Sequence, residues 1–218
     1  MRLTHLGHSC VLVESADVRV LVDPGTFAHD LTGVRDLDLV IVTHQHPDHL
    51  DVDRLPALVA ANPAARVLCD PGSAPVLADA GVEATVHDGP TTVRDLTVTP
   101  LGETHALIHE DVPRIPNVGV RLDADGEPSF VHPGDALDAE PGEVDVLCFP
   151  LSAPWAASRD TTAFLRRIDP AHAVPIHDGL LQDRGRAVYL GQAEQLGGER
   201  TRVHDLAGEG ATEFRAGE

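Results

Sequence analysis

The sequence predicts an α/β (α+β) protein in which two β-sheets are covered by helices, a four-layer αβ/βα sandwich. Three observations lead to this fold class. Segments typical of strands come in two batches, and each batch is followed by segments with helical spacing. The chain has 218 residues, which is enough for one domain with a full core. The sequence shows no clear internal repeat, low-complexity segment or linker, so we expect a single domain over residues 1–218.

The first batch of predicted strands lies in the N-terminal third of the chain, in short runs rich in β-branched and apolar residues. These strands are expected at residues 3–5, 9–13, 18–22, 37–42 and 66–69. The run at 37–42 is almost continuously apolar, which is typical of a strand buried on both faces. Helical spacing predicts helices at 52–61 and 73–80, with Asp51 or Asp53 capping the first and Gly81 ending the second.

The second batch follows the same pattern. Strands are expected at residues 84–87, 91–94, 96–100, 117–122, 129–132, 144–150, 171–176 and 200–205, and helices at 161–168 and 185–196. The strands at 117–122 and 129–132 form a predicted hairpin that turns at 123–126. The segment 105–116 is a long loop with two prolines. Loops of this length without secondary structure are more often functional than not, so we expect this loop to border a site.

Composition and charge narrow the classes of function. The chain carries 35 acidic and 16 basic residues, a net charge of −19, and every basic residue is Arg. A protein this acidic repels phosphate backbones and anionic membranes, which disfavours nucleic acid as a partner. The absence of Lys excludes a Schiff-base or Lys-nucleophile mechanism. A small-molecule substrate is expected instead, and the sequence predicts no particular oligomeric state.

The cysteines and the N-terminus predict a cytoplasmic protein. Cys10, Cys69 and Cys148 lie in apolar, strand-like runs and form no CxxC pair, which favours reduced, buried thiols. The first residues lack the apolar core of a signal peptide. No apolar stretch approaches the roughly 18 residues of a membrane span, so none is expected.

The strongest chemical signal directly follows the buried strand at 37–42 and reads His44-Gln45-His46-Pro47-Asp48-His49. Neutral imidazoles and carboxylates are ligands that zinc and related metals accept. Side chains two residues apart in an extended segment point the same way, so His44 and His46 can hold one ion together. The chain then turns at Pro47, which lets Asp48 and His49 face a second ion.

Six residues cannot complete a two-metal site, so further ligands are expected at later strand ends. Three residues fit: His105 in the long loop, Asp135 after the predicted strand at 129–132, and His177 directly after the predicted strand at 171–176. Each alone is a weak signal, because a single histidine at a strand end is more often structural. Because all three follow predicted strands, the assignment of each as a ligand supports that of the others.

With these residues in place, the chain resembles the metallo-β-lactamase superfamily over nearly its whole length. The segment Thr43–His49 is similar to the T-H-x-H-x-D-H signature of that superfamily. The dipeptide Gly134-Asp135 resembles its later G-D motif, and His177 with the two residues before it resembles its final His motif. The N-terminal segment 4–9 and the tripeptide 22–24 are similar to the small single-domain branch that includes ascorbate-phosphate lactonases.

The resemblance implies the αβ/βα fold of that superfamily and a set of ligands. It implies that one metal is held by His44, His46 and His105. It implies that a second is held by Asp48, His49 and His177, and that Asp135 bridges both. The Asp within the signature favours a hydrolase over the flavin-linked di-iron relatives, whose pattern resembles H-x-E-x-D-H. No cysteine occupies the bridging position, which argues against an antibiotic-resistance type of site.

The expected function is therefore metal-dependent hydrolysis by a metal-bridging hydroxide, on an ester, lactone, amide or phosphodiester. Asp48 is the expected catalytic residue, because it lies near the bridging water and can orient it and accept its proton. Zinc is the expected ion, and manganese or iron fits the same ligands. Two alternatives stay open: a catalytically silent metal-binding sensor or scaffold, and an iron-dependent redox enzyme on the same fold.

Several other residues have two readings on sequence alone. His8 either approaches the site or is a hydrogen-bonded structural histidine. Asp23 either orients a ligand imidazole, as such imidazoles usually require, or belongs to a turn beside Pro24. Trp155 is expected in packing, with a pocket wall as the alternative. His109 and Arg114 lie in the long loop, where Arg114 is a candidate anion contact.

Overall fold

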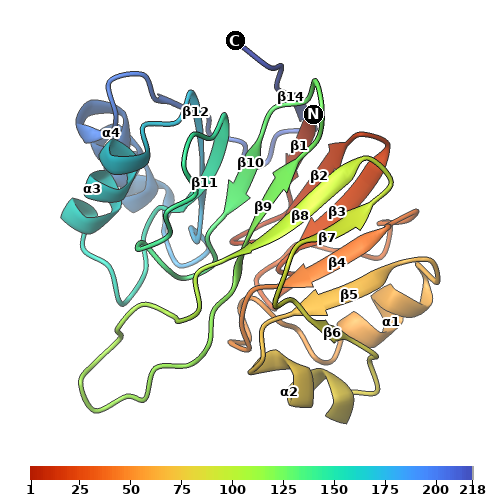
Figure 1. Cartoon of the computed structure of the whole chain (residues 1–218). Coiled ribbons are helices and arrows are strands. Elements are labelled where there is room, and N and C mark those ends of the chain that lie inside the picture. Colours follow the sequence, from red (N-terminus) through yellow and green to blue (C-terminus); the bar gives the residue numbers. More distant parts are fainter. Residues whose placement is uncertain (218) are drawn as a thin grey trace.

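The first of two seven-stranded sheets is built mainly from the N-terminal third of the chain (Figure 1). The computed structural model describes residues 1–217. The strand order in this sheet is β14-β1-β2-β3-β4-β5-β6. Its strands are β1 (Arg2–His5), β2 (Val11–Ser15), β3 (Val18–Val22), β4 (Leu39–Val42), β5 (Arg66–Cys69), β6 (Thr85–Val86) and β14 (Thr212–Glu213). Strands β3, β4, β5 and β6 run parallel, so their carboxyl ends meet at one edge.

The second sheet has the order β13-β12-β11-β10-β9-β8-β7. Its strands are β7 (Thr91–Val93), β8 (Leu96–Leu101), β9 (Gly119–Asp123), β10 (Phe130–His132), β11 (Val146–Pro150), β12 (His172–Ile176) and β13 (Arg202–Val203). Strands β9 and β10 pair antiparallel, which confirms the predicted hairpin. Strands β10 to β13 run parallel, so this sheet also gathers its strand ends at one edge.

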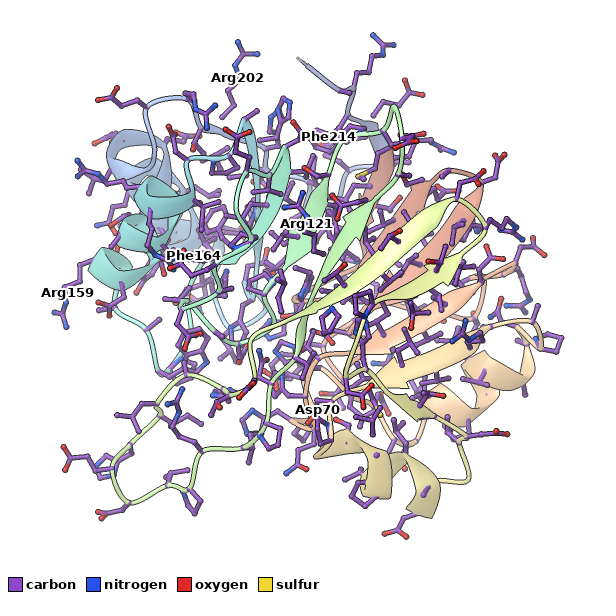
Figure 2. All side chains as sticks on the ribbon, viewed as in Figure 1. Asp70, Arg121, Arg159, Phe164, Arg202 and Phe214 are labelled. Atoms are coloured by element: carbon purple, nitrogen blue, oxygen red, sulfur yellow. The ribbon has the colours of Figure 1, made fainter. Side chains whose placement is uncertain are left out.

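Helices cover the outer face of each sheet, which confirms the four-layer αβ/βα sandwich (Figure 1). The helices are α1 (Leu55–Ala60), α2 (Ser73–Asp79), α3 (Ser158–Ile168) and α4 (Asp183–Leu196). Helices α1 and α2 pack on the first sheet, and α3 and α4 pack on the second. Figure 2 shows Phe164 on the side of α3 that faces the second sheet, whereas Arg159 points outward. A third apolar cluster fills the space between the two sheets.

Strand β4 shows how the apolar run at 37–42 became a strand buried on both faces. All four of its residues are buried. Leu39 and Ile41 belong to the cluster between the sheets, while Val40 and Val42 belong to the cluster under α1 and α2. Alternate side chains of a strand point to opposite faces, so a strand covered on both sides needs an apolar residue at every position.

Several elements differ from their predicted bounds, and three of the differences have a clear physical cause. Helix α1 begins at Leu55 rather than at 52, because the Asp51 carboxylate accepts hydrogen bonds from the backbone N–H groups of Asp53 and Arg54 and holds a turn there. Helix α3 begins at 158 rather than at 161, and the Asp160 carboxylate binds the backbone N–H just before it. Strand β14 was not expected, since it depends on long-range pairing with β1.

The three cysteines are buried free thiols, as the sequence predicts. Burial raises the pKa of the Cys69 thiol to about 12, so this thiol stays protonated and unreactive at neutral pH. Among residues 1–217, no helix combines the length and apolarity needed to cross a membrane.

Candidate metal centre

The carboxyl ends of strands from both sheets bring all seven predicted ligands together. The motif at 44–49 follows β4, His105 follows β8, Asp135 follows β10 and His177 directly follows β12. These side chains form two adjacent groups in which the potential donor atoms lie within 4.8 Å of one another. The first group consists of His44, His46, His105 and Asp135. The second consists of His8, Asp48, His49 and His177.

Asp135 lies between the two groups. Its Oδ2 is 3.3 Å from Nε2 of His105 in the first group and 3.2 Å from Nε2 of His177 in the second. Its Oδ1 is 3.1 Å from Nε2 of His49. The carboxylate is 2% exposed, so its charge is shielded from water and acts on these imidazoles. Asp135 therefore lies close to nitrogen atoms of both groups.

Two imidazoles are oriented by Asp23 and Thr43, which lie behind the ligands. His49 Nδ1–H donates to Asp23 Oδ2 over 2.7 Å. The Thr43 hydroxyl donates to the same oxygen over 2.8 Å, so its own oxygen accepts from His44 Nδ1–H over 3.1 Å. A neutral imidazole has one N–H and one lone pair, so His44 turns the lone pair of its Nε2 toward the site. Nε2 of His49 also faces the site, 3.1 Å from Oδ1 of Asp135, and would offer its lone pair once an ion replaces the proton there.

Backbone carbonyls orient two further imidazoles in the same way. His105 Nδ1–H donates to the carbonyl of Ala106 over 2.7 Å. His177 Nδ1–H donates to the carbonyl of Ser152 over 2.9 Å. Their Nε2 atoms therefore also face the site. Metal-ligating histidines commonly donate their other ring N–H in this way.

The donor set fits cations better than it fits hydrogen bonding. His44 Nε2 and His46 Nδ1 face each other at 3.1 Å, and the first of these carries a lone pair. Nε2 of His105 and Oδ1 of Asp135 are buried with no hydrogen-bond partner among residues 1–217. Buried polar atoms without partners are costly, so their convergence here indicates a place for a positive ion.

The electrostatics of the site support the same interpretation. Burial and the neighbouring imidazoles hold the pKa of His44 well below its ordinary value, so this ring is neutral and its lone pair is available. Burial also opposes protonation of His49, but the Asp135 and Asp23 carboxylates outweigh it and raise its pKa well above the ordinary range. Two carboxylates that attract a proton so strongly would also attract a metal ion.

The backbone around the site adopts conformations that are rare for non-glycine residues. The φ angles of His8, Asp23 and His177 are 55°, 51° and 56°. Non-glycine residues keep a positive φ only when the surrounding structure holds them there, and such residues cluster at functional sites. Gly25 allows close approach of the chain, because a Cβ there would lie 1.9 Å from the carbonyl oxygen of Asp48.

The structure decides between the two readings of several residues. Asp23 binds His49 directly, so it orients a ligand candidate. Trp155, expected in packing, donates from Nε1 to Asp135 Oδ2 over 3.0 Å and borders the site. Ser152 was missed, and no local signal marks it, since it acts through its backbone carbonyl. His109 is exposed on the long loop and belongs to neither group of donors.

A cavity of about 90 Å³ lies beside the first group, under the long loop. His46 and His105 line one side of it, and apolar side chains of the loop, including Ile108 and Val112, line the other. Arg114 also lines it, and its Nε donates to the carbonyl of His105. Figure 1 shows this loop extending beyond the two sheets between β8 and β9. Cavities of about 390 and 570 Å³ lie along α1 and contain none of the candidate ligands.

Comparison with known proteins shows the family of this chain. The model of the "Beta-lactamase superfamily domain" matches residues 2–177. Protein Rv0786c of Mycobacterium tuberculosis is 41% identical over 197 residues, which cover 90% of this chain and 92% of that protein. A UPF0173 metal-dependent hydrolase of Methanosphaerula palustris is 34% identical over 199 residues, covering 81% of this chain and 83% of the relative.

Solved structures share the fold at low sequence identity. Igni18, a metallo hydrolase of Ignicoccus hospitalis, has a TM-score of 0.73 at 20% identity, covering 98% of this chain and 99% of that one. An isothiocyanate hydrolase from Delia radicum gut bacteria has a TM-score of 0.73 at 17% identity, covering 99% of this chain and 100% of that one. Matches to the family model and to relatives over most of both chains place this protein in the beta-lactamase superfamily, among its metal-dependent hydrolases.

Proposed function

We propose that the protein hydrolyses a small-molecule substrate at a dinuclear metal centre. One ion would be held by His44, His46 and His105. The other would be held by Asp48, His49 and His177, and Asp135 would contact both ions. The observation that carries this proposal is the shared orientation of the imidazoles. Four rings donate Nδ1–H outward and turn Nε2 toward the space around Asp135.

Two divalent ions bound there would supply an activated water near neutral pH and would stabilise negative charge on the scissile carbonyl or phosphoryl oxygen. Zinc is the proposed ion, with manganese or iron as alternatives, because imidazole and carboxylate ligands suit all three. The candidate bonds are those of an ester, a lactone, an amide or a phosphodiester.

The chain itself would position the reacting groups. Asp48 is the most open carboxylate of the centre, with 24% of its side chain exposed against 3% for Asp135. Burial opposes its ionisation, but the hydrogen bond from His8 and the charge of His49 lower its pKa to about 2. Asp48 is therefore ionised at neutral pH and can accept a hydrogen bond, and then a proton, from an attacking water.

The surroundings of the centre favour a substrate with a small apolar substituent. The 90 Å³ cavity beside His46 and His105 is lined mainly by apolar side chains of the long loop. Trp155 closes the site near Asp135, with its ring 5.8 Å from that of His105 and 6.1 Å from that of His177. Aliphatic esters, lactones and amides fit these surroundings better than highly charged substrates do.

The proposal is tested first by metal content. Elemental analysis of protein purified without added metal should give about two ions per chain, and zinc as the main element. His44→Ala and Asp135→Ala should each lose metal, while His109→Ala, which changes an exposed histidine of the long loop, should keep both ions. Equal metal content in all three variants would contradict the assigned ligands.

Activity is tested next on a panel of ester, lactone, amide and phosphodiester substrates. Metal-loaded wild-type protein should hydrolyse at least one class, and His44→Ala should abolish turnover while the fold survives. Consistent inactivity of the metal-loaded protein would favour the silent sensor. Coloured, iron-loaded protein with a visible absorbance band would favour the redox alternative.

A further inference from the structure

His8 faces the second group of donors with its imidazole turned the opposite way from the ligand candidates. By distance alone it belongs to that group, because its donor atom lies within 4.8 Å of those of Asp48, His49 and His177. The ring is buried, with 1% of the residue exposed. Its hydrogen bonds, however, leave no lone pair on the nitrogen that faces the site.

The tautomer of His8 follows from a backbone donor. The N–H of Gly179 can only donate, and it lies 3.0 Å from Nδ1 of His8. Nδ1 must therefore accept, which places the ring proton on Nε2. Nε2–H in turn donates to Asp48 Oδ2 over 3.1 Å. In four ligand candidates, His44, His49, His105 and His177, it is Nδ1–H that donates away from the site, and Nε2 faces the site.

Several contacts hold His8 in this orientation. Its carbonyl accepts hydrogen bonds from His5 Nε2 over 2.9 Å and from the backbone N–H of His177 over 3.1 Å. Its ring packs edge-on against Phe27, with centroids 5.1 Å apart, and lies 4.2 Å from the ring of His177. Gly179 approaches so closely that a Cβ there would lie 3.0 Å from His8 Nδ1.

The acceptor, Asp48 Oδ2, is the oxygen that lies among the ligand nitrogens. It is 3.6 Å from Nε2 of His177 and 4.0 Å from Nε2 of His49. A carboxylate oxygen has two lone pairs, so one can accept from His8 while the other meets an ion. Asp48 is also the more exposed carboxylate of the centre, so its side chain has the greater freedom to move without such a contact.

We propose that His8 is a positioning residue and not a metal ligand: its Nε2–H fixes Asp48 Oδ2 in the place where the second ion binds. This inference rests on the proposed dinuclear centre. The second ion would then have three ligands of its own, Asp48, His49 and His177, and would share Asp135 with the first.

The test compares two substitutions at His8. Both new side chains are unbranched at Cβ, as histidine is, so the positive φ at this position should strain both variants to a similar degree. In His8→Gln, the amide oxygen can accept from Gly179 and the amide N–H can donate to Asp48, but no nitrogen lone pair is available for a metal. In His8→Leu, the donor is lost. His177→Gln is the matched control at a ligand position. Zinc stoichiometry and affinity, measured by competition with a chromogenic chelator, are the primary readout.

We expect His8→Gln to bind two zinc ions with nearly wild-type affinity. His8→Leu should bind the second ion about 10- to 100-fold more weakly, as for other residues that orient a ligand. His177→Gln should lose that ion. If His8→Gln loses one ion as His177→Gln does, His8 is a ligand and the inference is overturned. If His8→Leu matches the wild type, His8 positions nothing.

A second readout does not depend on metal binding. Long-range proton–nitrogen NMR spectra of the metal-free protein distinguish the two tautomers of a neutral imidazole. We expect the proton of His8 on Nε2 and that of His44, a neutral ligand candidate, on Nδ1. A proton on Nδ1 of His8 would overturn the inference even in a protein that binds metal. Failure of the wild type to bind any ion would instead refute the dinuclear centre and the positioning role together.

Discussion

Asp23 connects the two ends of the ligand motif. Its Oδ1 accepts from the backbone N–H of Thr43 over 2.8 Å, and its Oδ2 accepts from the Thr43 hydroxyl and from Nδ1–H of His49. The residue is fully buried. A single carboxylate thus fixes the tautomer of one ligand candidate directly and that of His44 through Thr43.

Asp23→Asn should weaken metal binding about 10- to 100-fold, because an amide cannot accept all of these hydrogen bonds and His49 loses its orientation. Chelator competition measures this. Asp145→Asn is the matched control, since Asp145 accepts from the backbone N–H and hydroxyl of Ser129, both over 2.8 Å. Equal weakening in both variants would mean that Asp23 acts only through general stability.

The distance along the chain between interacting residues determined how much of the centre could be predicted from the sequence. The spacing of His44, His46, Asp48 and His49 is local, so it was visible without a structure. The contact between His8 and Gly179 joins residues 171 positions apart, and no pattern within either segment indicates it. Trp155 was assigned to packing for the same reason, because its partner Asp135 is 20 residues away.

At the scale of the element, helix α3 is held to the second sheet by a few apolar side chains. Phe164 is 1% exposed and lies in the cluster of that sheet, with Leu165 beside it. Phe164→Ala should lower the free energy of unfolding by about 3–5 kcal/mol, through lost burial and the cavity left behind. Urea denaturation measures this change.

Arg159→Ala is the surface control on the same helix, since that side chain points outward (Figure 2). Its effect should stay within about 0.5 kcal/mol. Similar losses in Phe164→Ala and Arg159→Ala would show that α3 is stabilised by something other than this apolar contact.

The turn before α1 should contribute stability that depends on pH. Burial opposes ionisation of Asp51, but its contacts with Arg54 and with the backbone N–H of Asp53 outweigh it and lower its pKa. A carboxyl group with a lower pKa in the folded chain stabilises the fold above its unfolded pKa of about 3.9. This stabilisation is lost as the pH falls through the folded value.

Asp51→Asn keeps an acceptor for the backbone N–H groups but loses the charge that pairs with Arg54, so it should lower the free energy of unfolding by about 0.5 kcal/mol at neutral pH. The difference from the wild type should shrink below pH values of about 4. Urea denaturation of metal-free protein across this range measures it, with the exposed neighbour Asp53→Asn as the control. A difference that does not change with pH would contradict the assignment to Asp51.

At the scale of the whole molecule, the candidate centre joins the two sheets. The motif at 44–49 belongs to the first sheet, and His105, Asp135 and His177 belong to the second. A binding site made from residues of both sheets exists only in the folded chain. Binding of an ion there therefore adds directly to the stability of the fold.

Removal of metal should therefore destabilise the protein. Zinc at 100 times its dissociation constant should add about 2.7 kcal/mol to the free energy of unfolding, and dialysis against a chelator should remove it. Differential scanning calorimetry with and without zinc measures the shift in Tm. His44→Ala should show a smaller shift, and an equal shift in that variant would place zinc elsewhere on the chain.

The sequence by itself determined the two batches of strands, the strand buried on both faces and the side chains that gather at the strand ends. These features follow from local periodicity and from the chemistry of imidazole and carboxylate groups. Only the tertiary structure decided how His8 and four of the ligand candidates orient their rings, that Trp155 binds Asp135, and that β14 pairs with β1. Each of these depends on a hydrogen-bond partner brought from a distant part of the chain, which local residue patterns do not encode.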